Sequence, residues 1–116
     1  MSLYVQLVAL LNHATDAGDR LYPNAAPDKP GKPYIVYLRI AANSENVLSG
    51  TSGLVNTRVQ IDCYADSYMA AQTLADQVDA LMRGWVLQTV SYPAIDQYEP
   101  DVRLHRVILD YSVWHT

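Results

Sequence analysis

The spacing of hydrophobic residues changes once within residues 58–82. Polar and apolar residues alternate at first, with Val59, Ile61 and Cys63 on one side of an extended chain. Apolar residues then recur at spacings of three and four, as on one face of a helix. That apolar stripe contains Ala71, Leu74, Ala75, Val78, Leu81 and Met82. We therefore predict a strand with one solvated face, followed by a helix that covers a sheet and ends at Gly84.

Another amphipathic helix is predicted near the N-terminus. Its apolar residues at helical spacing are Leu3, Leu7, Val8 and Leu11. Ser2 can cap this helix, which we expect to end in the region of residues 15–18. Asp66 or Ser67 is expected to cap the later helix.

Three further segments have the composition of strands. Residues 34–42 are rich in β-branched and aromatic side chains, residues 85–92 stop at Pro93, and residues 102–114 form the longest strand. Residues 22–33 carry four of the six prolines and are predicted to be a surface connection. The pattern predicts one α+β domain over residues 1–116, in the order α-β-β-α-β-β. Two helices should cover a mainly antiparallel four-stranded sheet.

Residues 43–56 are dominated by Asn, Ser, Gly and Thr, and are predicted to be a long, mobile hairpin loop between the first two strands. The loop also contains apolar residues with no clear core position, so it is suited to ordering against a partner protein. A solvated hairpin tip is the alternative. The expected protein-interface residues are Asn43, Glu45, Asn46, Val47, Leu48, Ser49, Thr51, Ser52 and Leu54, with Leu48 and Leu54 as anchors.

Composition narrows the class of protein. The 116 residues are half hydrophobic, and the formal net charge is −4 with only eight scattered Lys and Arg residues. Stable nucleic-acid binding usually depends on clustered cations, so we do not expect it. No apolar run is long enough to cross a membrane, and no signal peptide is apparent. The single cysteine agrees with a reducing, cytosolic compartment.

The residues that could carry catalysis do not form a recognisable site. Cys63 falls on the apolar side of its strand, and His13, His105 and His115 lie in different elements without metal-ligand spacing. Residues 48–54, LSGTSGL, lack the Lys of a phosphate-binding loop and the last glycine of a nucleophile elbow. We expect no catalytic, cofactor-binding or metal-binding residue, no cofactor and no enzymatic activity.

Four segments together resemble a known family. Residues 33–37 (PYIVY), 49–53 (SGTSG) and 58–62 (RVQID), and the alanine-rich helix at 70–81, match in order and spacing the tail-completion proteins of long-tailed phages and prophages. The resemblance covers most of the chain and thins after Gly84.

This resemblance implies a structural function. Members of the family are thought to form a ring, commonly a hexamer, at the head-proximal end of the tail tube, where they end tube polymerisation and dock the tail onto the head. The implied partners are further copies of the chain, the tail-tube protein and the head connector protein. The implied locations are the host cytoplasm during assembly and the virion tail afterwards. A connector or head-closure protein, or a small α+β ligand-binding or regulatory module, is the alternative.

Overall fold

The computed structural model describes residues 2–47 and 50–116, and describes side chains outside residues 41–54. Within those residues it contains two helices, α1 (Leu3–Leu11) and α2 (Tyr68–Arg83), and six strands. The strands are β1 (Leu21–Pro23), β2 (Tyr34–Val47), β3 (Gly50–Ala65), β4 (Gln88–Ser91), β5 (Ile95–Glu99) and β6 (Leu104–His115). The predicted α+β class is confirmed.

All six strands join one sheet in the order β1-β2-β3-β6-β4, with β5 beside β6. The β1–β2 pair is parallel, and the other pairs recorded for this sheet are antiparallel. The prediction of four strands was therefore wrong in number and order. The two missed strands give weak sequence signals, because β1 is very short and ends in Pro23, and nearly all of β5 is exposed.

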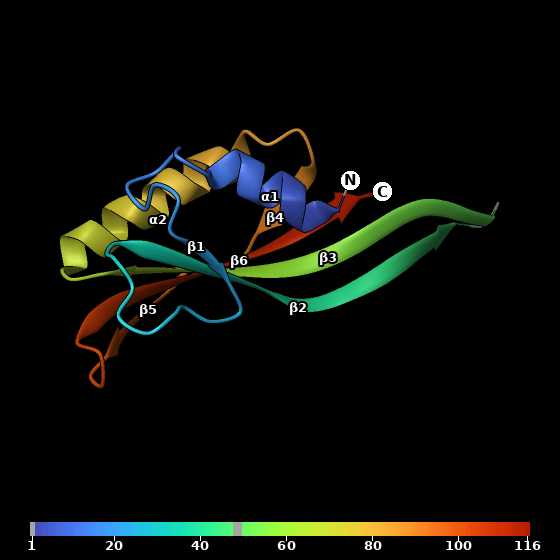
Figure 1. Cartoon of the computed structure of the whole chain (residues 1–116). Coiled ribbons are helices and arrows are strands. Elements are labelled where there is room, and N and C mark those ends of the chain that lie inside the picture. The colour runs from blue at the N-terminus through green and yellow to red at the C-terminus, as the bar shows by residue number, and fades with distance from the viewer. Residues whose placement is uncertain (1, 48–49) are drawn as a thin grey trace.

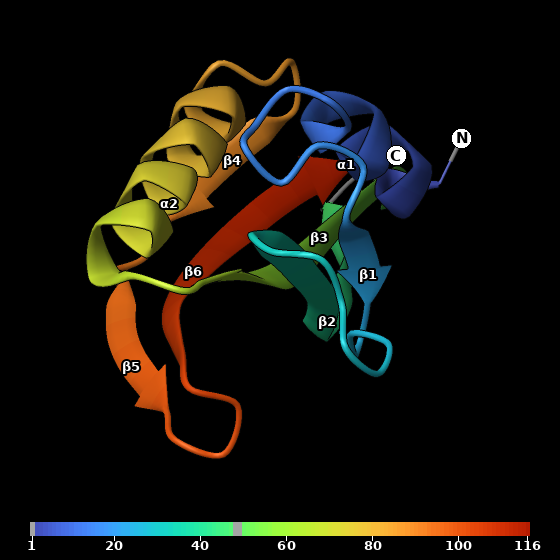
Figure 2. The same ribbon diagram turned by 60° about the vertical axis from the view of Figure 1, so that its left-hand side comes forward.

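Both helices lie on the same face of the sheet (Figures 1 and 2). The Ser2 hydroxyl accepts a hydrogen bond from the Val5 backbone N–H, and the first helix ends at Leu11, earlier than expected. Ser67, rather than Asp66, caps α2 by accepting a bond from the Ala70 N–H, and Gly84 follows the last turn as predicted.

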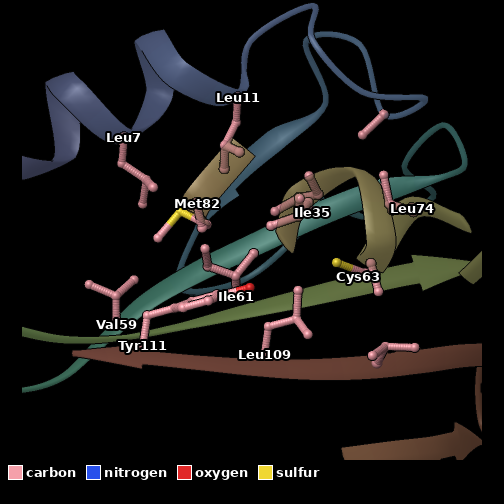
Figure 3. Close-up of a cluster of buried hydrophobic side chains, with 14 of the residues drawn as sticks. Leu7, Leu11, Ile35, Val59, Ile61, Cys63, Leu74, Met82, Leu109 and Tyr111 are labelled. Atoms are coloured by element: carbon pink, nitrogen blue, oxygen red, sulfur yellow. The ribbon is translucent and has the colours of Figure 1, made fainter. Parts of the chain in front are cut away.

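The hydrophobic core fills the space between the helices and this covered face (Figure 3). Its largest fully buried side chains include Leu7, Leu11, Ile35, Ile61, Leu74, Met82 and Tyr111. Burial of each such side chain stabilises the fold by about 1.5–3 kcal/mol. Cys63 is fully buried among them, which confirms its predicted place on the apolar face. Burial, together with the neighbouring Asp62 charge, raises the pKa of its thiol far above the usual range.

The structure contradicts the long loop predicted for residues 43–56. Strands β2 and β3 continue into this region as a paired hairpin, with Asn43 opposite Asn56 and Val47 opposite Gly50. We call residues 40–47 and 50–56 the arm. Figure 1 shows the arm extending past the helices and the other strands, and the molecule measures 51 × 25 × 24 Å. Backbone pairing explains the error, because the hydrogen bonds between β2 and β3 form whatever the side chains are, and a composition of Asn, Ser, Gly and Thr does not reveal them.

Candidate functional site

The face of the sheet opposite the helices, which we call the open face, differs chemically from the covered face. Figure 2 shows it between β5 and the loop that joins β1 to β2. Residues paired across antiparallel strands share a face, so the recorded register identifies its members. They include Tyr34, Val36, Leu38, Arg58, Gln60, Asp62, Tyr64, Leu104, Arg106, Ile108 and Asp110. Charged, aromatic and aliphatic groups are therefore mixed on this face.

A charge network joins three strands of the open face. Asp62 on β3 is only 2% exposed, and its Oδ2 atom accepts a hydrogen bond from Arg106 Nη2 at 2.7 Å. Arg106, on β6, also donates from Nη1 to Glu99 Oε1 on β5 at 2.9 Å. Gln60 Nε2 donates to the other Asp62 oxygen at 2.9 Å. These bonds compensate for burying the Asp62 carboxylate and hold β5 against the sheet.

Arg106 remains a cation in this environment. Burial by itself lowers the pKa of the guanidinium, but its hydrogen bonds to Glu99 and Asp62 outweigh that effect, so the pKa is raised. Its buried Nε atom has no hydrogen-bond partner within the described part of the chain. The arrangement connects β3, β5 and β6 through one guanidinium group.

A more exposed ion pair lies nearer the arm. Arg58 Nη2 donates to Asp110 Oδ2 at 2.6 Å, and Arg58 Nε is 3.1 Å from Asp110 Oδ1. The guanidinium also lies over the Tyr92 ring, 4.2 Å from its centroid. The Arg58 side chain keeps 43% of its exposure, so solvent weakens this pair relative to the pair of Asp62 and Arg106.

Tyrosines line the other side of the open face. The rings of Tyr34 and Tyr64 stack with centroids 4.8 Å apart, and Tyr22 meets Tyr34 edge-on at 6.0 Å. Tyr34 and Tyr64 line a hollow of about 280 Å³ together with Asp62 and Arg106. Aromatic rings next to paired charges are suited to contact with a protein surface.

A polar contact on the covered face connects α2 to β6. The Tyr111 hydroxyl donates to Asp79 Oδ1 at 2.8 Å, and Arg83 donates to Asp79 Oδ2 at 2.6 Å. Burial raises the pKa of Tyr111, and its bond to ionised Asp79 raises it further. Burial alone would raise the pKa of Asp79, but the hydrogen bonds from Arg83 and Tyr111 lower it overall. At neutral pH, Tyr111 therefore stays protonated and Asp79 stays ionised.

The structure supplies no assembled catalytic or metal site within its described residues. No group of three or more His, Cys, Asp and Glu side chains there is placed to hold a metal ion. Likewise, neither helix in the described ranges is long and apolar enough to span a bilayer.

The predicted interface residues map mainly onto the arm. Asn43, Glu45, Asn46 and Val47 lie on β2, and Thr51, Ser52 and Leu54 lie on β3. The strand register brings Asn46 opposite Thr51. Leu48 and Ser49 fall outside the described residues. Sequence reasoning missed the open-face network, because its members become neighbours only when the pairing of β3, β5 and β6 is known.

Comparisons with known proteins identify the family of the chain and a solved structure with a similar fold. Residues 2–116 match the family described as "Tail completion protein gp17". A solved chain in the "Virion of native gene transfer agent (GTA) particle" shares the fold with a TM-score of 0.63 and 16% sequence identity, over 93% of this chain and 82% of that chain. The comparison with curated proteins gives no match. The chain belongs to the tail completion protein gp17 family, a family of structural phage-tail proteins.

Proposed function

We propose that this chain forms a ring, such as a hexamer, at the head-proximal end of a phage tail tube. There it ends tube polymerisation and joins the tail to the head. The observation that carries the proposal is the arm, which projects from a body that is otherwise held together by its own core (Figure 1). A projecting element that meets a different surface of the next copy is a heterologous contact, and such contacts form a ring when the rotation between copies closes.

The arm supplies the interface in this proposal, with Asn43, Glu45, Asn46, Val47, Leu48, Ser49, Thr51, Ser52 and Leu54 as its contact residues. It contacts a neighbouring copy or the tail tube. Each contact is weak alone and gains strength when several form at once, so the isolated chain is a monomer or a weak oligomer until a tail end gathers the copies. Sedimentation of the purified chain, with and without tail tubes, measures this difference.

The proposed partners are other copies of the chain, the tail-tube protein and the head connector protein. Assembly takes place in the host cytoplasm, and the chain remains in the virion tail. A formal net charge of −4 is compatible with a position around a channel through which DNA slides, because an acidic wall does not grip phosphates. The proposed function is structural and requires no catalytic step or cofactor.

Electron microscopy of particles made without this chain tests the proposal. We expect free heads beside tails of abnormal length, and complementation with the intact gene should restore joined particles. Free heads beside tails of normal length would instead indicate a connector or head-closure function. Normal infectious particles without the chain would overturn the proposal.

A further inference from the structure

Strand β4 presents an unprotected edge of the sheet. It pairs with β6 on one side and is the last strand on its side of the recorded order. The Tyr92 N–H, which directly follows β4, donates to the Asp110 carbonyl on β6 at 2.9 Å. Backbone groups of an antiparallel strand alternate in direction, so Val90 also bonds toward β6, whereas Thr89 and Ser91 direct their N–H and C=O groups outward.

Other edges of this sheet carry features that discourage pairing. On the opposite side, β1 is only three residues long and ends in Pro23. Past β4, Pro93 and Ala94 interrupt the register with β6, and β5 then carries Asp96 and Glu99. Short strands, prolines, register breaks and charges are common protections of edge strands.

Like β1, strand β4 is short, with four residues, and Pro93 follows soon after it, but no proline or charge interrupts residues 88–92 themselves. Residues 85–92 contain no charged side chain. Val86, Val90 and Tyr92 are 91%, 44% and 40% exposed, although large apolar side chains are usually covered when they cluster. An uncharged edge with unpaired backbone groups and exposed apolar side chains is suited to accept an added strand.

The arm has the complementary property. Beyond Tyr37, where β1 ends its pairing, the outer edge of β2 has no recorded strand partner in the described part of the arm. From residue 40 to residue 47 the only charged residue is Glu45. The arm extends away from its own body, while β4 lies at the side of the sheet beyond β6 (Figure 1). A second copy can therefore bring its arm to this edge.

We propose that β4 accepts the arm of a second copy as an added strand, through the outer edge of β2 in that copy. This inference rests on the proposed ring and identifies which surface of the chain receives the arm. Arm and edge are different surfaces, so each copy can give one arm and accept another, and the chain of contacts closes into a ring.

Chemical cross-linking in assembled particles tests the contact. The variants complement the deletion strain and carry Cys63→Ala, which removes the single native cysteine. A chain with both Val90→Cys and Ser44→Cys, treated with a short bismaleimide, should give a ladder of multimers after denaturation. A second chain with Asn43→Cys in place of Ser44→Cys samples the other face of the strand. The control pair is Asp28→Cys with Ser44→Cys, because Asp28 is exposed in the connection after β1, at the opposite edge of the sheet from β4.

Backbone variants test the strand addition itself. Ser91→Pro removes a predicted outward N–H without removing a bond to β6, and should lower the cross-linked yield about tenfold. Ser91→Ala keeps the N–H and should leave the yield unchanged. Particles that contain the chain but cross-link no more than the Asp28 control would overturn this inference and leave the proposed function standing. Absence of the chain from tail ends would overturn both this inference and the proposed function.

Discussion

The arm and the helix-covered body are built from the same two strands and differ in what stabilises them. In the body, β2 and β3 contribute Ile35, Ile61 and Cys63 to a core that the helices close (Figure 3). In the arm, the same strands continue their pairing past the helices (Figure 1). Backbone pairing alone thus extends the sheet, but burial of side chains fixes the body. The core lies on the covered face of the body, and the pairing of β2 with β3 continues beyond that core.

The largest expected effect comes from the body. Leu74→Ala should lower the free energy of unfolding by about 3–4 kcal/mol, because Leu74 is fully buried and its removal leaves a cavity under α2. Urea unfolding followed by circular dichroism measures the loss. Ser44→Ala, a small change in the arm, is the control and should cost less than about 0.5 kcal/mol. Equal losses for the two variants would contradict the division between body and arm.

Two ion pairs on the open face should contribute differently to stability, and the more buried pair should contribute more. Arg106→Ala should cost about 2–3 kcal/mol, because it leaves the buried Asp62 carboxylate without its cation. Arg58→Ala, the matched change at an exposed pair, should cost clearly less than Arg106→Ala, because solvent screens this pair. Chemical unfolding of both variants provides the comparison. A larger loss for Arg58→Ala would show that the network around Asp62 does not hold β5 and β6 in place.

Cys63 gives a smaller test of the core. Cys63→Ala should cost about 1–2 kcal/mol and leave assembly intact, because this thiol packs against the core and has no chemical task. Its raised pKa and complete burial should also make labelling of the folded protein slow. Ellman's reagent, applied before and after unfolding, measures accessibility. Rapid labelling of the native chain, or assembly lost without loss of fold, would contradict a packing role.

The smallest effect on stability is expected for the arm. Replacing Leu48 and Leu54 together by Ser should change the free energy of unfolding by less than about 0.5 kcal/mol while abolishing attachment of heads to tails. Thermal unfolding and electron microscopy measure the two outcomes on one variant. A large drop in melting temperature would assign these leucines to the core, and normal infectious particles would show that they are not anchors.

The sequence was most informative where burial of one side makes apolar residues recur at a regular spacing. The alternation at Val59, Ile61 and Cys63 and the helical stripe that includes Leu74 correctly predicted β3 and α2. Such patterns exist because one side of each element must be apolar. The arm and β5 lack that requirement, so their polar residues resembled loops and turns. The bond between Asp62 and Arg106 depends on strand register across 44 positions of sequence, which composition does not encode.

The continuous course of β3 has a mechanical consequence. This strand runs from the arm into the core, and its pairing with β6 extends from Val55 to Ala65. Force that pulls on the arm along its length runs parallel to β3 and across the hydrogen bonds to β6. Those bonds are loaded in shear and share the force, rather than opening one at a time. β2 has register shifts near Ile40 and Glu45, so bending strain concentrates on that side of the hairpin. The arm therefore resists tension along its length better than it resists sideways displacement.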